Sequence, residues 1–220
     1  MLVDKDDDLR RIFDLAASMD VIIVVHAEDE EIIAENRAII SAIYGNAEVP
    51  VRVHCKIRPA EACLRATERA IALARQYGTR LHIAHVSTAD EAALLSNEPL
   101  SPSKRITAEV SPHHLLWCAE EDGDNPRMKM NPAVKTAADR EALRRAVVDG
   151  RIDIIATDHA PHLLSEKSGG ALHAASGAPM VQYSFPAMLG LFDPTTVVRL
   201  MCHNPAQLCG ILLRGVLAPG

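Results

Sequence analysis

The chain alternates short apolar runs with longer segments in which apolar positions recur every three or four residues. The apolar runs are 21–25 (VIIVV), 80–88 (RLHIAHVST), 105–111 (RITAEVS) and 152–157 (IDIIAT). Near-continuous apolar runs of this length are typical of buried strands. The segments 59–78 and 136–150 have helical periodicity, and each ends in glycine, a common residue after a helix.

Strands that alternate with helices predict a parallel α/β fold. Four strands can be read, and the segment 128–131 (MKMN) is expected to add a partial fifth. Residues 163–179 are rich in Gly, Ala and Ser and are predicted to form a long loop, which in compact domains is usually functional. The glycine-rich motifs of dinucleotide-binding and P-loop proteins do not occur in the sequence.

Composition and charge exclude several classes of function. The 220 residues are 48% hydrophobic and 24% charged, with a formal net charge of −6, one Trp, three Tyr and three Phe. A chain of this kind lacks the basic stripe and stacking surface of a nucleic-acid-binding protein. No apolar run approaches the ~20 residues that a membrane span needs. Five cysteines without CxxC spacing favour free thiols, and we expect a cytoplasmic protein.

Ionisable side chains gather just after the predicted strands. His26, His85 and Asp158 each follow an apolar run, as do the adjacent His113 and His114. In a parallel β/α barrel the carboxyl ends of the strands form the active-site face, so we expect the first three side chains to lie in one mouth. Imidazole and carboxylate groups there can bind a cation of zinc type. His113 and His114 are equally well explained as caps of the helix that follows them.

Other ionisable residues have simpler explanations in the sequence. Alternation along the strand predicts that His82 faces the helix layer, and His54 has no strand-end context. Glu28 belongs to a charged run of the kind that is favoured at the N-terminus of a helix.

Sequence motifs along most of the chain resemble those of dihydroorotases in the amidohydrolase superfamily. ATDHAPH (156–162), followed by four residues and Lys167, resembles the dihydroorotase signature. Further blocks resemble the same family in the same order: VVHAEDE, RPAEAC, LHIAHVST, AEVSPHHLLW, KMNPAVKTAADREAL and AASGAPMVQYSFPAML. The resemblance covers nearly all of residues 1–210, whereas related cyclic amidohydrolases vary the residues after the aspartate.

The resemblance implies a metal-dependent TIM (β/α)8 barrel, incomplete in this chain and spanning residues 1–210. Residues 211–220 are expected to begin a truncated C-terminal β-rich subdomain. The family's first-strand HxH pair is absent from the sequence, and its bridging ligand, a carboxylated Lys or an Asp, is expected upstream of residue 1. The chain therefore resembles an internal fragment of a dihydroorotase that lacks the N-terminal HxH strand. We expect the fragment alone to be inactive or nearly so.

The resemblance also implies roles for the matching residues. His26 and His85 correspond to ligands of one zinc ion, and Asp158 corresponds to a ligand of a second zinc ion and to the general acid/base. Positions that contact the substrate in the family fall on Asn131, His162, Gly177, Ala178 and Pro179.

These features predict a zinc-dependent dihydroorotase, which interconverts dihydroorotate and N-carbamoyl-aspartate in de novo pyrimidine biosynthesis. The alternatives are another cyclic amidohydrolase, of allantoinase or hydantoinase type, and a non-catalytic dihydroorotase-like scaffold subunit. The missing ligands favour the scaffold, whereas His26, His85 and Asp158 together favour an enzyme. We expect a small-molecule substrate and no nucleic-acid or membrane partner, and leave open a homo-oligomer or an aspartate transcarbamoylase partner.

Overall fold

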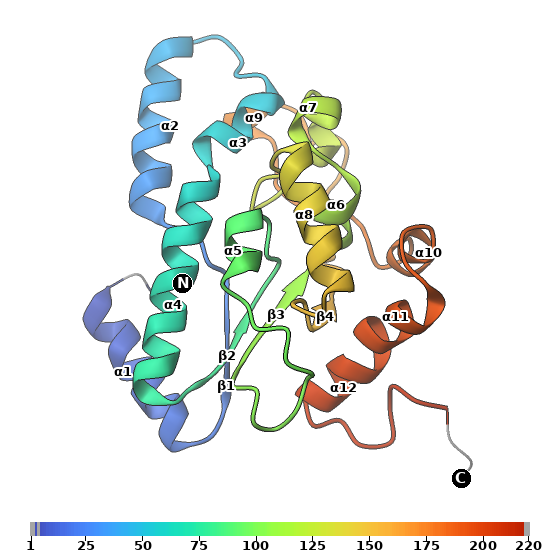
Figure 1. Cartoon of the computed structure of the whole chain (residues 1–220). Coiled ribbons are helices and arrows are strands. Elements are labelled where there is room, and N and C mark those ends of the chain that lie inside the picture. The colour runs from blue at the N-terminus through green and yellow to red at the C-terminus, as the bar shows by residue number, and fades with distance from the viewer. Residues whose placement is uncertain (1–2, 4, 218–220) are drawn as a thin grey trace.

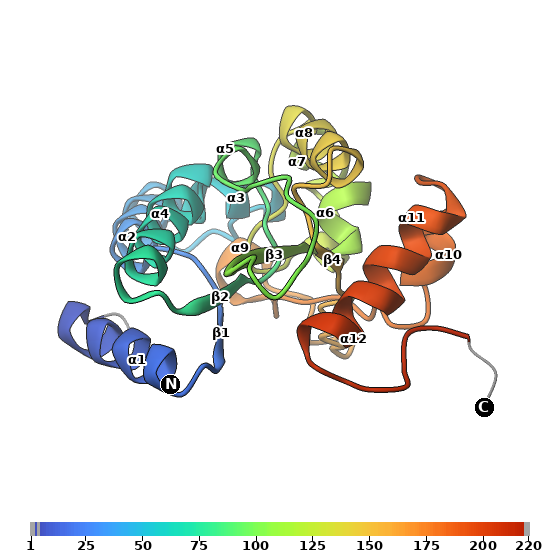
Figure 2. The same ribbon diagram turned by 60° about the horizontal axis from the view of Figure 1, so that its bottom comes forward.

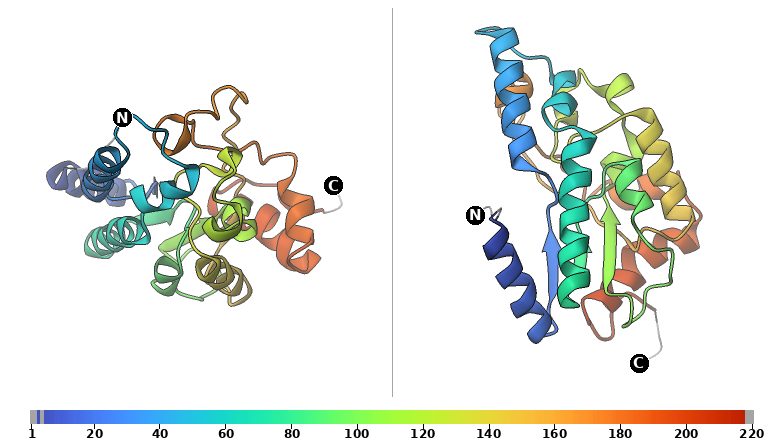
Figure 3. Two further views of the ribbon diagram at one scale, coloured as in Figure 1. Left: turned by 90° about the horizontal axis from the view of Figure 1, so that it is seen from above. Right: turned by 60° about the vertical axis from the view of Figure 1, so that its left-hand side comes forward.

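Four parallel strands form one sheet in the computed structural model, which describes residue 3 and residues 5–217. Their order in the sheet follows the chain: β1 (Ile22–Val25), β2 (Arg80–Ile83), β3 (Ile106–Val110) and β4 (Ile154–Ile155). Helices connect each strand to the next, and the strand arrows point to the same end of the molecule (Figures 1 and 3). The four predicted strands are confirmed, and they correspond to half of the eight strands of a closed barrel.

The helices that pack beside the strands are α1 (Asp6–Ser18), α4 (Ala60–Tyr77), α5 (Ala89–Ala93) and α8 (Ala137–Val148). α2 (Glu30–Tyr44) extends beyond the carboxyl end of β1 (Figures 1 and 3). Beyond β4 the chain turns into α10 (Ser184–Leu189), α11 (Pro194–Val198), the π-helical η3 (Arg199–His203) and α12 (Asn204–Leu208). α1 flanks the β1 side of the sheet, and α10–α12 flank the β4 side (Figure 2).

Short helical turns connect these elements at the carboxyl end of the strands. They are η1 (Val51–Val53), α3 (His54–Ile57), α6 (Pro112–Leu116), α7 (Ala119–Asp122), η2 (Pro126–Met128) and α9 (Gly170–His173). Within the described residues no helix is both long enough and apolar enough to cross a membrane.

Sequence signals account for the ends of the main helices. Thr136 and Asp139 form a capping box at the start of α8, and the Asp29 side chain accepts from backbone amides at the start of α2. α4 ends at Gly78, which adopts the left-handed conformation that favours glycine. These caps fix where each helix starts or stops relative to the strands.

Alternation along the strands decides which side chains face the helices. Leu81 and Ile83 of β2 are fully buried in the main core together with residues of α4. His82 lies on the opposite face, where its ring contacts the Thr107 hydroxyl and the Glu109 carboxylate of β3. The prediction that His82 faces the helix layer is wrong, because its apolar neighbours occupy that face.

The MKMN segment does not form the expected partial strand. η2 ends at Met128, and the backbone that follows is irregular, with a cis peptide bond between Asn131 and Pro132. The Lys129 carbonyl accepts from the Lys167 ammonium and from the Gly177 amide instead of from a neighbouring strand. This segment therefore bonds to the 163–179 loop, which is irregular apart from α9.

The C-terminal end of the chain adds no strand within the described residues. Residues 211–217 form turns, and residues 218–220 lie outside the described part of the chain. The division into a barrel part at 1–210 and the start of a β-rich subdomain at 211–220 stays a prediction.

Candidate functional site

The side chains that were singled out at strand ends all lie at the carboxyl end of the sheet. His26 directly follows β1, His85 follows β2 by two residues, and Asp158 follows β4 by three. His85 and Asp158 have φ values of +41° and +43°, a left-handed conformation that costs roughly 1–2 kcal/mol in a residue other than glycine. Strain of this kind is often retained where a side chain must point to a particular place.

The two strand-end histidines face each other. His26 Nδ1 lies 2.9 Å from His85 Nε2, and the rings meet edge to face with centroids 4.7 Å apart. On its other side, His26 Nε2 lies 2.8 Å from Glu28 Oε2. An ionised carboxylate only accepts hydrogen bonds, so Nε2 carries the proton and the Nδ1 lone pair faces His85.

Glu28 contacts the strand-end His26 in a way that the sequence did not reveal. Its side chain is fully buried and accepts from His26 and from the Arg58 guanidinium. Burial alone would raise the pKa of Glu28, but the His26 hydrogen bond and the Arg58 charge together lower it, so the carboxylate is ionised. Arg58 lies 30 positions further along the chain, and its contact with Glu28 arises only from the fold.

The opposed nitrogens are compatible with a metal site as well as with a simple hydrogen bond. The buried Nδ1 of His85 has no partner among the described residues in either tautomer, so it does not decide between the two. If His85 carries its proton on Nδ1, two lone pairs converge 2.9 Å apart, close to the ~3.3 Å between two nitrogens on a tetrahedral zinc ion. Burial lowers the pKa of His85, which favours the neutral ring.

Asp158 lies near a buried chain of polar groups. Asp158 Oδ2 is 3.6 Å from His113 Nε2, and Ser111 Oγ is 2.7 Å from both His113 Nε2 and His114 Nδ1. His114 Nε2 in turn lies 3.0 Å from the Pro132 carbonyl. Burial lowers the pKa of His113 to about 3, so the ring is neutral beside Asp158. The two histidines lie inside α6 rather than capping it from outside.

Asp158 and the two histidines share one end of the sheet but do not form one tight ligand set. Within the described residues, one group of three potential ligands lies within 4.8 Å, namely Cys118, Glu121 and Asp122. Two of those acidic side chains are already engaged, by Arg140 and by the Cys118 amide. The separation of Asp158 from the histidines is compatible with two metal positions, each of which needs further ligands.

Asn131, expected to contact substrate, is held by His54. His54 Nε2 lies 2.9 Å from Asn131 Oδ1 and 3.0 Å from the Met130 carbonyl. Burial, assisted by the Lys129 charge, lowers the pKa of His54 to about 4, so the neutral ring donates from Nε2. Asn131 Oδ1 therefore accepts a hydrogen bond from His54, and the side-chain nitrogen of Asn131 can donate to another group. Sequence reasoning missed His54, because 77 positions separate it from Asn131.

The predicted substrate loop packs on the segment that follows β4. His162 Nε2 lies 3.0 Å from the Ser176 carbonyl, and the Ala160 amide donates to the Ala178 carbonyl at 3.1 Å. Gly177 has a φ of +136°, and a Cβ there would lie 2.6 Å from Ala160 Cβ and from its carbonyl oxygen. Only glycine allows this close approach between the loop and the strand end.

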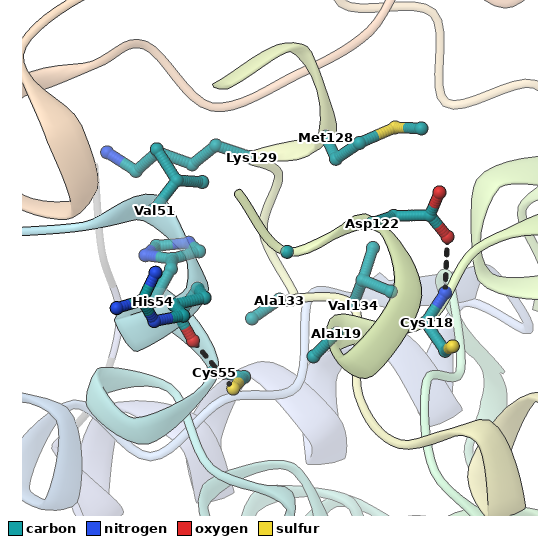
Figure 4. A pocket seen from close by; sticks show the side chains of 12 residues that line it. Val51, His54, Cys55, Cys118, Ala119, Asp122, Met128, Lys129, Ala133 and Val134 are labelled. Carbon is teal, nitrogen blue, oxygen red and sulfur yellow. Dashed lines mark hydrogen bonds between the residues drawn. The ribbon is translucent and has the colours of Figure 1, made fainter. Parts of the chain in front are cut away.

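A separate hollow is lined by parts of residues 51–55, 118–123 and 128–134 (Figure 4). His54, Cys55 and Lys129 lie on one side of it, and Cys118 and Asp122 lie on the other. No residue predicted to bind metal or substrate is among those that line it. The predicted site residues therefore lie in the strand-end cluster and not in this hollow.

Comparisons with known proteins agree on one family. The amidohydrolase family model matches residues 2–220. A dihydroorotase of Lactiplantibacillus plantarum is 40% identical over 159 residues, which cover 69% of this chain and 37% of that protein. A Geobacillus dihydroorotase is 34% identical over 220 residues, covering 93% of this chain and 48% of that protein. The chain thus spans about half the length, or less, of these relatives.

Solved structures of cyclic amidohydrolases have the same fold. The L-hydantoinase of Arthrobacter aurescens superimposes with a TM-score of 0.90 at 29% identity, covering 100% of this chain and 50% of the hydantoinase. A dihydropyrimidinase of Brevibacillus agri superimposes with a TM-score of 0.88 at 21% identity, with the same coverage, and supports the fold alone. The predicted α/β fold, part of a TIM barrel of amidohydrolase type, is confirmed.

Proposed function

The chain belongs to the amidohydrolase family, and from that premise we propose that its site serves a dihydroorotase reaction, the interconversion of dihydroorotate and N-carbamoyl-aspartate. The observation that carries the proposal is the opposed pair of His26 and His85, with ring nitrogens 2.9 Å apart in the mouth that also holds Asp158. The dihydroorotase relatives, at 34–40% identity, support this substrate.

Zinc is the metal that we propose for this site. His26 and His85 would hold one ion and Asp158 the other, because imidazole and carboxylate suit zinc and the lone pairs of the two rings face each other. When bound, the metal would polarise the amide carbonyl and lower the pKa of water. Glu28 would keep the His26 ring oriented, as carboxylates behind metal-binding histidines commonly do. The 220 residues contain no HxH pair, so the remaining metal ligands would have to be other groups.

Asp158 is proposed as the general acid/base. Its carboxylate, 31% exposed, reaches the mouth and is backed by the neutral ring of His113. It would accept a proton from the attacking water and deliver that proton to the ring nitrogen as the amide C–N bond breaks. Transfer by a positioned group of this kind typically contributes ~10²–10⁴-fold to the rate.

The surroundings of Asn131 favour an anionic substrate. Lys129, Lys135 and Lys167 are buried, and none of them forms an ion pair with the described residues. Positive charge held in a low-dielectric site attracts anions. We propose that Asn131, His162 and the backbone of residues 177–179 contact the ring and carboxylate of dihydroorotate.

A hydantoinase-type reaction is the second candidate, favoured by the structural likeness to the L-hydantoinase. The two substrates differ in charge, because dihydroorotate carries a carboxylate and hydantoin does not. The buried lysines therefore favour dihydroorotate. A homo-oligomer, an aspartate transcarbamoylase partner and a cytoplasmic location stay predictions from the sequence.

A chimera tests the proposal. The chain replaces the aligned segment of the Geobacillus dihydroorotase, which supplies the rest of the barrel, and the product is assayed with zinc on dihydroorotate, hydantoin and allantoin. We expect turnover of dihydroorotate alone, a loss of ~10²–10⁴-fold in Asp158→Asn and no change in the exposed control His203→Ala. The 220-residue chain by itself is expected to show little or no turnover.

Other outcomes of the same assay would decide between the alternatives. Turnover of hydantoin without dihydroorotate would support the hydantoinase-type reaction. A folded chimera that binds zinc but turns over none of the three substrates would support a non-catalytic scaffold.

A further inference from the structure

The ammonium group of Lys167 is enclosed by backbone carbonyls of the predicted substrate loop and its neighbour. Lys167 Nζ lies 2.8 Å from the carbonyl oxygens of Lys129 and Ala175 and 2.9 Å from that of Gly177. An ammonium has three N–H donors, and these three acceptors use all of them. The residue is 6% exposed, so no donor is left over for a ligand.

The three acceptors belong to two segments that are far apart in the sequence. Lys129 precedes Asn131 by two positions, whereas Ala175 and Gly177 belong to the 163–179 loop. The Gly177 amide also donates to the Lys129 carbonyl at 2.9 Å, which joins the two segments directly. A single side chain thus ties the segment that carries Asn131 to the loop that is expected to meet the substrate.

The same loop is fixed on its other side to the end of β4. The Ala160 amide donates to Ala178, and the His162 ring contacts the Ser176 carbonyl. The loop therefore lies between the strand end that carries Asp158 and the Asn131 segment. A shift of this loop would move its backbone relative to Asp158 and Asn131 together.

We propose that Lys167 is a positioning residue for the substrate: its ammonium sets the distance between Asn131 and the backbone of residues 177–179, and thereby the affinity for dihydroorotate and N-carbamoyl-aspartate. The inference rests on the proposed function and adds a residue that does not touch the substrate. Hydrogen bonds from a charged donor are roughly twice as strong as neutral ones, and an apolar replacement would leave three carbonyls without their donor.

Arginine cannot replace this lysine. A guanidinium is planar and presents its donors as a fork, whereas the three carbonyls surround one nitrogen atom. Lys167→Arg therefore keeps the charge but loses the geometry. It separates an effect of positive charge on an anionic substrate from an effect of the three hydrogen bonds.

Lys104 offers a matched control at the other end of the sheet. It is also buried, and its Nζ has three acceptors: the carbonyls of Ser96 and Glu98 and the carboxylate of Asp153. Lys104 lies just before β3 and Asp153 just before β4, so this cluster is at the amino end of the strands. Lys104→Met combined with Asp153→Asn removes a similar buried lysine without leaving a carboxylate unpaired.

The experiment compares Lys167→Met, Lys167→Arg and the control double variant in the full chain. Amide hydrogen exchange is read at Gly177 and Ala160, and affinities for zinc and for N-carbamoyl-aspartate in the presence of zinc are measured by calorimetry. We expect both Lys167 variants to speed exchange at these amides and to weaken N-carbamoyl-aspartate binding by about 10- to 100-fold, with zinc affinity unchanged. The control should lower the melting temperature and leave loop exchange and ligand affinity as in the wild type.

Kinetics in the chimera provide a second measurement. The Lys167 variants should raise KM while kcat at saturating substrate changes little, because the reacting groups are intact. If Lys167→Met does not fold, Lys167→Arg is the deciding variant.

Several results would overturn the inference. Unchanged exchange at Gly177 and Ala160 would show that Lys167 does not hold the loop, and faster exchange with unchanged affinity would show that the loop does not set binding. Failure of the wild-type chimera to bind N-carbamoyl-aspartate or to turn over dihydroorotate would instead refute the proposed function, and the exchange measurement would still decide whether Lys167 holds the loop.

Discussion

Replacement of Gly177 by alanine is the most direct test of how the substrate loop is placed. The residue has a φ of +136°, and an added Cβ would lie 2.6 Å from both the Cβ and the carbonyl oxygen of Ala160. A His162 ring nitrogen would lie 3.2 Å away. The methyl group would therefore push the loop away from the segment that carries Asp158.

The energy of this change has two parts. A side chain in such a backbone conformation costs about 1–3 kcal/mol, and overpacking against the Ala160 backbone costs about another 1–3 kcal/mol. The reduced freedom of the unfolded chain returns about 0.4–1 kcal/mol. If the loop keeps its place, we expect the free energy of unfolding to fall by about 1–6 kcal/mol, against a typical total of about 5–15 kcal/mol.

The loop can instead relieve the clash by moving, and the two responses can be separated. Urea unfolding of the chain measures the stability, and the KM of the chimera for dihydroorotate measures the placement of the loop. Movement of about 1 Å is expected to cost on the order of 100-fold in kcat/KM with a smaller loss of stability. In either case zinc affinity should not change, because the side-chain hydrogen bonds of His26 and His85 within the described residues do not involve the loop.

Gly78→Ala is the matched control. Gly78 also has a positive φ, +70°, but nothing lies within 4 Å of the position that its Cβ would take. We expect a loss of about 1 kcal/mol in stability and no change in KM. If Gly177→Ala behaves like Gly78→Ala in both measurements, then the loop does not depend on close contact with Ala160 and our account of its position is wrong.

Three further predictions concern the metal site and the buried histidines. Glu28→Gln should weaken zinc binding about 10- to 100-fold by calorimetry, because His26 loses its charged partner, and an unchanged affinity would remove Glu28 from the site. His85→Ala should abolish zinc binding that the exposed control His203→Ala retains; equal affinities would show that zinc binds elsewhere. Burial lowers the pKa of His54 to about 4 in the folded state, whereas the ring keeps its ordinary pKa of about 6.5 in the unfolded state. As the pH falls, the unfolded state therefore takes up the proton first and becomes more favoured. Stability should be full above about pH 6.5 and fall by about 3 kcal/mol towards pH 4 in urea titrations, and His54→Gln should flatten this slope.

The sequence predicted those features that depend on local pattern and on the direction of the strands. Apolar runs marked all four strands, and parallel strands place their carboxyl ends together, so His26, His85 and Asp158 could be assigned to one end before any coordinates were known. The same pattern failed at 128–131, because the Lys129 carbonyl bonds to Lys167 and Gly177 rather than to a strand.

Contacts between distant positions could not be predicted in this way. Glu28 was assigned to a charged run at the start of a helix, yet its buried carboxylate contacts Arg58 and His26. His54 had no neighbouring motif, and its role depends on Asn131, which is distant in the sequence. Lys167 belongs to the recognised signature, but only the three carbonyls around its ammonium indicate what it does.

The two ends of the sheet differ in how completely their polar groups are satisfied. At the amino end Lys104 pairs with Asp153, and the Thr79 hydroxyl donates to the Phe13 carbonyl. At the carboxyl end His85 is strained and leaves a buried ring nitrogen without a partner among the described residues. Local rules are usually broken where a site must bind something, since the ligand supplies the missing interactions. A cation between the strand-end histidines would take up the facing nitrogens of both rings. The buried lysines of the same end donate to backbone carbonyls and form no ion pair with the described residues, so their charge favours an anion nearby. Both features are those that the proposed reaction, with a metal ion and a carboxylate-bearing substrate, would use.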